Sequence, residues 1–183
     1  MQRKAILEMK SGSPPRTKEP TVSVAHLAAA IGTAAAIDFR QKEQICDRIH
    51  AEQPNLLASV LALPRLRVSM QTVDILLNAL IVLTLSVDKS GQRLTTVTEV
   101  DQERELERLV ATMRFSKGLD ASSMAKSIQQ TTAYRHESCL LSYVVDTLRR
   151  AGLTEAKDEA AKYFILAAIN IVNCIATAKR LRS

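Results

Sequence analysis

Apolar residues along this chain recur mostly at spacings of three and four, which place them on one face of an α-helix. The clearest stretch runs from Val68 to about Asp88 and is apolar nearly all round after Asp74. A helix of this kind is normally surrounded by other helices. We therefore predict that this segment is the central helix of a bundle.

An earlier helical pattern begins at Thr21 or Ser23, both residue types that cap helices, and runs to about Gln53. Its many alanines allow a neighbouring helix to approach closely, and Gly32 is a candidate break within it. Pro54 ends the pattern.

After the central helix, Leu94 to Val97 is predicted as a loop or a brief extended piece, because no second strand pattern is present to pair with it. Thr98 and Asp101 resemble a capping box, although Asp replaces the usual Glu or Gln, and they open a helix that is acidic first and basic at its end. The next helix is predicted over 121–130 with a continuation to 150, and the final helix runs from Thr154, its predicted cap, to about Lys179.

These patterns predict an all-α, single-domain bundle of five or six helices over residues 21–183. The composition agrees, because 46% of the residues are hydrophobic, 3% are aromatic, and the chain has only 5 Gly. Such a composition excludes collagen, disulfide-rich mini-proteins and wholesale disorder, and it argues against barrels of repeated strands. No period of 20 to 50 residues repeats, which counts against a solenoid.

Residues 1–20 differ from the rest, because they contain three prolines, five basic residues and two acidic residues. We predict that they form a flexible, disordered basic arm. The whole chain has a formal charge of +6 and a pI near 9.4, so half of its net charge lies in this arm. A basic protein attracts nucleic acid, acidic protein surfaces or anionic lipid.

The cysteines and the most apolar segments indicate where in the cell the protein is expected. Cys46, Cys139 and Cys174 are an odd number of thiols in a chain without a secretory leader, which predicts free thiols and a cytoplasmic protein. The apolar runs within 68–87 and 163–178 are interrupted by polar residues and fall short of the about 20 residues that cross a bilayer. We expect buried bundle helices and no membrane partner, rather than a membrane hairpin.

Two Cys/His pairs are candidates for zinc ligands. Cys46 with His50, and His136 with Cys139, have spacings that place each pair on one helical face. Nothing in the sequence shows that the pairs meet, so we predict no metal and no cofactor and keep a zinc-binding or enzymatic protein as an alternative. The residue types of 136–139 suit nucleophilic catalysis, but their side chains diverge on a helix. No catalytic residue is predicted, and we expect a non-enzyme.

A second alternative is a regulator with a helix-turn-helix. Leu27 to Gly32 has the leucine, alanine and glycine spacing of the first helix and turn of that motif. The following residues, 33–36, offer no side chain that reads a base, and Asp38 stands where an inward apolar residue is expected. Close helix packing explains the pattern better.

Outside the arm, basic residues cluster at expected helix ends, where cations also stabilise the terminal carbonyls. These candidate nucleic-acid-binding residues are Arg65, Arg67, Arg149, Arg150, Lys179, Arg180 and Arg182. The low aromatic content provides little base stacking, so contacts to nucleic acid are expected at the backbone. We predict a non-catalytic helical subunit or adaptor that contacts nucleic-acid backbone or a protein partner through these residues.

Overall fold

The computed structural model describes residues 22–116 and 137–182. The predicted basic arm and the first part of the helix predicted over 121–150 lie outside the described residues. The elements, in chain order, are α1 (Val24–Ala36), α2 (Phe39–Glu52), α3 (Pro54–Leu61), the 3-10 helix η1 (Leu63–Leu66), α4 (Met70–Lys89), β1 (Gln92–Leu94), α5 (Glu99–Ser116), α7 (Ser138–Arg150), α8 (Glu159–Thr177) and β2 (Arg180–Arg182).

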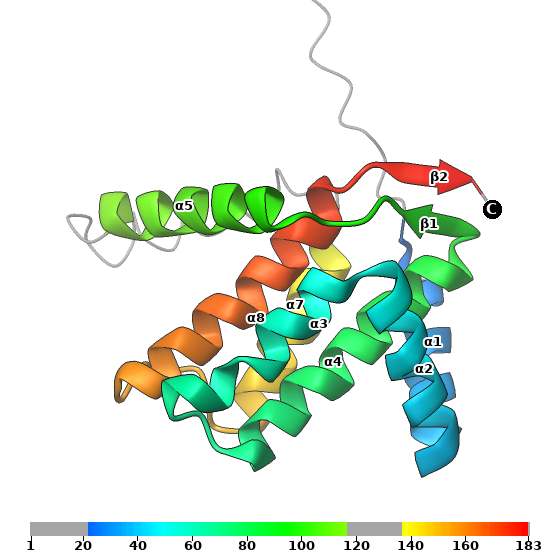
Figure 1. Cartoon of the computed structure of the whole chain (residues 1–183), viewed down its shortest axis with the longest axis horizontal. Coiled ribbons are helices and arrows are strands. Elements are labelled where there is room, and N and C mark those ends of the chain that lie inside the picture. Colours follow the sequence, from blue (N-terminus) through cyan, green and yellow to red (C-terminus); the bar gives the residue numbers. More distant parts are fainter. Residues whose placement is uncertain (1–21, 117–136, 183) are drawn as a thin grey trace, which may run out of the picture.

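The helices form a bundle around α4, which confirms the predicted fold class (Figure 1). Ten of the 20 residues of α4 are buried. Helices α1, α3 and α7 pack on α4, α8 packs on α7, and α5 crosses one end of the bundle against α8. The central helix predicted from the hydrophobic pattern is therefore the centre of the observed core.

The first helical pattern forms two helices instead of one. Helix α1 continues through Gly32 and ends at Ala36. The Asp38 side chain then accepts a hydrogen bond from the backbone N–H of Gln41 (2.8 Å), and the Gln41 amide oxygen accepts one from the N–H of Asp38 (2.9 Å). This reciprocal capping box starts α2. The described chain has seven α-helices, against the five or six expected, partly because of this division.

The prediction that no sheet forms after the central helix is wrong at Leu94. Strand β1 pairs with β2 in an antiparallel ribbon, with Arg93 opposite Leu181 and Leu94 opposite Arg180. The final helix ends at Thr177, two residues before its predicted end, and Arg180–Arg182 form the second strand. Each strand has only three residues, too few for an alternating pattern to stand out.

The boundaries of the last two helices follow local capping. Gly152 follows α7 with a φ of +69°, a left-handed conformation that glycine adopts without strain. Helix α8 is capped by Asp158, whose side chain accepts a hydrogen bond from the N–H of Ala161 (2.7 Å), so Thr154 is not the cap.

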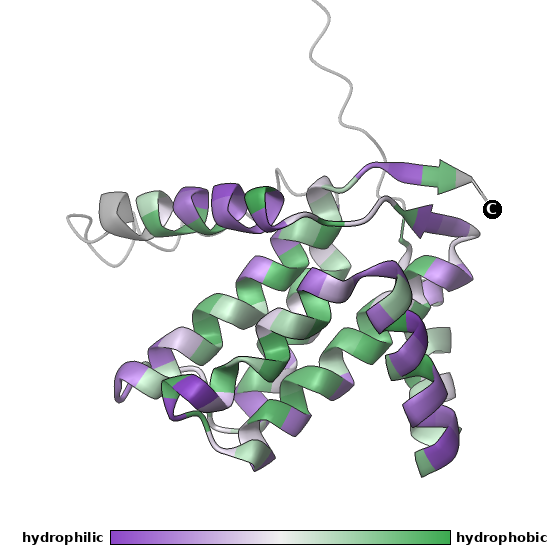
Figure 2. Ribbon diagram, viewed as in Figure 1, coloured by the Kyte–Doolittle hydropathy of each residue, from purple (hydrophilic) through white to green (hydrophobic). Residues whose placement is uncertain are grey.

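Two helices, α4 and α8, are long and apolar enough by composition to cross a membrane. Inside the bundle, 56% of the most apolar window of α4 and 44% of that of α8 are buried. Figure 2 shows that their hydrophobic residues line the middle of the bundle. Leu80 and Phe164, one from each helix, are fully buried. The apolar residues of both helices thus contribute to the core.

Candidate binding surfaces

Four of the predicted basic residues lie at the end of the bundle where η1, the end of α7 and the start of α8 meet (Figure 1). Arg65 and Arg67 are exposed, and neither has an ion pair within the described part of the chain. Arg149 and Arg150 are 73% and 80% exposed, and both pair with the carboxylate of Asp146. One carboxylate faces two guanidinium groups, so one positive charge remains.

The other three predicted residues lie at the opposite end, on the chain segment that forms β2 (Figure 1). Lys179 is exposed, whereas the Arg180 side chain is 15% exposed and lies 3.0 Å from the carboxylate of Glu137. Burial lowers the pKa of Arg180, and the negative charge of Glu137 opposes this effect. Arg182 pairs with Gln92 in the ribbon. The structure therefore divides the seven residues between two ends and holds Arg180 in an internal ion pair.

Glu137 connects three distant parts of the chain at this end. Its residue is 1% exposed, and its carboxylate accepts hydrogen bonds from the Arg180 guanidinium (3.0 Å) and from the backbone N–H of Val22 (3.1 Å). The Cys139 thiol donates to the carbonyl of Val22 (3.1 Å), and Arg180 also donates to the carbonyl of Ile175 (3.1 Å). These contacts fix the point at which residue 22 meets the C-terminal segment.

Two exposed basic residues at this end, Lys89 and Arg93, were not among the predicted site residues. Residues directly opposite in an antiparallel pair project to the same face. Arg93 therefore shares the outward face with Leu181, which is 54% exposed, while Leu94 on the other face packs against the core. Arg93 was missed because the ribbon that places it beside the C-terminal cations was not predicted.

The Gln53 side chain holds the segment that joins β1 to α5. Its amide nitrogen donates to the carbonyls of Leu94 (3.4 Å) and Thr95 (3.2 Å), and its amide oxygen accepts from the N–H of Val97 (2.9 Å). Asn55 donates to the carbonyl of Val97 (2.9 Å). Gln53 itself is 4% exposed. The junction of α2 and α3 thus positions the ribbon relative to the bundle.

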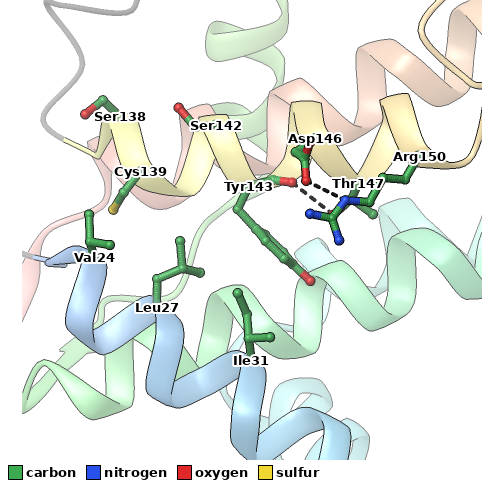
Figure 3. A pocket seen from close by; sticks show the side chains of 10 residues that line it. All are labelled: Val24, Leu27, Ile31, Ser138, Cys139, Ser142, Tyr143, Asp146, Thr147 and Arg150. Atoms are coloured by element: carbon green, nitrogen blue, oxygen red, sulfur yellow. Dashed lines mark hydrogen bonds and ion pairs between the residues drawn. The ribbon is translucent and has the colours of Figure 1, made fainter.

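A groove of about 660 Å³ separates α1 from α7 (Figure 3). Val24, Leu27 and Ile31 line it from α1, and Tyr143 reaches from α7 toward that wall. Burial raises the pKa of the Tyr143 hydroxyl. The groove ends at Arg150, which is also part of its lining. It is open to solvent, since Val24 is 71% exposed and Ile31 is 40% exposed.

The Cys/His pairs do not form a metal site in the part of the chain that the structure describes, where no three His, Cys, Asp or Glu side chains gather closely enough to hold an ion. His136 lies outside the described residues. Burial raises the pKa of Cys46 and Cys139, and it raises the pKa of Cys174 to about 12. A raised pKa lowers the fraction of thiolate, the nucleophilic form of the side chain, at neutral pH.

The turn required by the helix-turn-helix alternative is absent after Gly32. This glycine lies inside α1, and the Thr33 hydroxyl donates to the carbonyl of Ala29 (2.9 Å) within the same helix. The supposed start of a recognition helix is the last turn of α1.

No protein-family model, curated protein or solved structure matches this chain.

Proposed function

We propose that this chain is a non-catalytic, cytoplasmic helical adaptor that contacts the phosphate backbone of nucleic acid through the ribbon end of its bundle. The observation that carries the proposal is the grouping of three exposed cations, Lys89, Arg93 and Lys179, around one short ribbon. Lys89 ends the helix that leads into β1, Arg93 lies in β1, and Lys179 immediately precedes β2. The carbonyl of Lys179 accepts a hydrogen bond from the N–H of Thr95 (3.0 Å), which continues the pairing of the two segments.

The outward face of the ribbon supplies positive charge for contacts to phosphate. Arg93 and Lys179 are on the outward face, because Leu94 and Arg180 between them face the bundle. Cations placed in this way neutralise phosphates and release counterions, but they do not discriminate sequence. The chain has no Trp, three Tyr and three Phe, so base stacking contributes little.

The distribution of charge along the chain supports a nucleic-acid site at the ribbon end of the bundle. Of 25 basic and 19 acidic residues, five basic and two acidic residues lie in 1–21. The described residues contain 17 basic and 16 acidic residues and are almost neutral as a body. A polyanion would therefore be attracted by a local cluster rather than by the bundle as a whole. Residue 22, to which the basic segment is joined, is attached at the ribbon end.

The test is the salt dependence of binding to labelled duplex and single-stranded DNA and RNA. The triple variant Lys89→Gln, Arg93→Gln and Lys179→Gln should bind more weakly at low salt. Its log-log slope against salt should be smaller by about 0.9 for each duplex phosphate contact that is lost, or about 2.7 for three.

A matched variant with the same loss of charge, Arg65→Gln, Arg67→Gln and Arg149→Gln, alters the opposite end and should keep most of the affinity. Equal losses in the two variants would show a general effect of net charge and would contradict a ribbon site. Absence of binding to any nucleic acid at low salt would rule out the proposed function.

A further inference from the structure

Helix α1 carries no charged residue and is nevertheless largely exposed. Only His26 and Thr33 have polar side chains among its 13 residues, and only Leu27 and Ala30 are buried. A helix that is apolar all round is normally covered on every side. The uncovered side contains a stripe of exposed apolar residues at spacings of four, three and four, which are Val24, Ala28, Ile31 and Ala35.

The stripe borders the groove between α1 and α7, since Val24 and Ile31 belong to both (Figure 3). The spacing of the stripe is that of a helix that packs lengthwise against another helix. Small side chains, Ala28 and Ala35 on α1 and Ser142 on α7, allow a close approach. The lining of α7 extends from Ser138 to Arg150, or about 18 Å at 1.5 Å per residue. An open groove of this length fits a helix better than a small molecule.

The charge at one end of the groove indicates which kind of helix would bind there. Arg149 and Arg150 share the single carboxylate of Asp146, so this end has an excess of one positive charge. The other end is lined by Ser138 and Cys139, and no acidic side chain among the described residues lines it. Two copies of this chain that packed groove to groove in opposite directions would therefore bring no carboxylate of the described groove lining, other than Asp146 itself, to either arginine pair. Charge complementarity at this end therefore favours an acidic partner helix over a second copy of this chain.

We propose that the α1–α7 groove binds an amphipathic helix of another protein, with an apolar stripe of matching spacing and carboxylates at the end beside Arg149 and Arg150. Apolar contacts to the exposed side chains of Val24 and Ile31 supply most of the affinity, because covering such side chains contributes more than an exposed ion pair. The arginines choose the direction and the charge of the partner. This surface lies on helices other than those of the proposed nucleic-acid site.

The probe is a fluorescein-labelled, alanine-based helical peptide of about 18 residues, long enough to span the groove, with leucines at the spacings of the stripe and two glutamates at one end. Two further peptides carry glutamine or lysine in place of the glutamates. Anisotropy titrations with the full chain should give the tightest binding for the glutamate peptide and the weakest for the lysine peptide. Each step should be about threefold, as expected for exposed charge pairs.

Two variants separate the apolar and charged contributions. Ile31→Glu should weaken all three peptides by about tenfold or more, because the carboxylate replaces a buried contact. Phe39→Glu is the matched control, since Phe39 is 83% exposed on α2 and does not line the groove. Replacement of both arginines, Arg149→Gln with Arg150→Gln, leaves Asp146 as the charge of that end and should make the lysine peptide the tightest binder. Circular dichroism checks that each variant is folded.

Three results would overturn the proposal. The first is no saturable binding of the glutamate peptide, and the second is an equal loss of affinity in Ile31→Glu and Phe39→Glu. The third is that the peptides do not bind, while the chain forms a dimer or partitions into phosphatidylcholine vesicles. In that case Ile31→Glu abolishes the dimer or the vesicle binding. Such a result would assign the stripe to a second copy or to a membrane.

Discussion

At the scale of single residues, Glu137 is a carboxylate in an almost fully buried position. Its carboxylate is 1% exposed and is balanced by one guanidinium and one backbone N–H. A buried charge of this kind is tolerated only while its partners remain. The prediction that Arg180 is an exposed helix-end cation could not anticipate this pair, because Arg180 lies 43 residues from Glu137 and no local pattern links them.

Removal of the carboxylate should be more costly than removal of the whole pair. Glu137→Ala leaves Arg180 buried without a counter-charge and should lower the free energy of unfolding by about 3–5 kcal/mol. The double variant Glu137→Met with Arg180→Met should lose clearly less, because no charge stays buried. Urea unfolding followed by circular dichroism measures both. A double variant less stable than Glu137→Ala would contradict this account of the pair.

At the scale of elements, the sequence predicts features that depend on residues a few positions apart, such as helix caps. The cap at Thr98 is confirmed, since its hydroxyl accepts from the N–H of Asp101 (3.1 Å) and the carboxylate of Asp101 accepts in return from the N–H of Thr98 (3.1 Å). The ribbon could not be predicted in the same way, because α5, α7 and α8 lie between β1 and β2 in the sequence. Its position depends on Gln53, a side chain with no distinctive sequence pattern around it.

Loss of the Gln53 side chain should loosen the ribbon. Gln53→Ala leaves two carbonyls and one N–H without their partner and should destabilise the protein by about 1–3 kcal/mol. Asn55→Ala removes one hydrogen bond in the same place and should cost about 0.5–1.5 kcal/mol. If the ribbon binds nucleic acid as proposed, the Gln53 variant should also bind it less tightly under conditions where it remains folded. Thermal unfolding ranks the two variants, and an equal effect would argue against the special role of Gln53.

At the scale of the whole molecule, burial decreases from α4 outward. Half of α4 is buried, whereas α5 packs mainly on α8 and exposes Val100 to 69%. Hydrophobic periodicity predicted correctly that α4 is the centre, because a helix that is apolar on every side is normally surrounded by other helices. The pattern could not predict which helices remain partly uncovered, since α1 is as apolar as a core helix and still exposes one side.

Hydrogen exchange should reproduce this gradient. The amides of α4 should exchange only through global unfolding, and those of α5 should exchange faster through local detachment from α8. Exchange followed by mass spectrometry or NMR under native conditions compares the two helices within one sample. Equal protection of α5 and α4 would show that α5 is an integral part of the cooperative core.

The junction at Glu137 also has a consequence for the order of folding. The hydrogen bond from Val22 to Glu137 closes a separation of 115 residues, and contacts so distant in sequence pay a large loop entropy before they form. We expect the helices around α4 to assemble first and the junction to close after the rate-limiting step. Substitutions at Glu137 should then accelerate unfolding while they leave the folding rate nearly unchanged. The contacts of Glu137 with Val22 and Arg180 would then form late in folding. They would set the unfolding rate, and so the lifetime of the native state, rather than the folding rate.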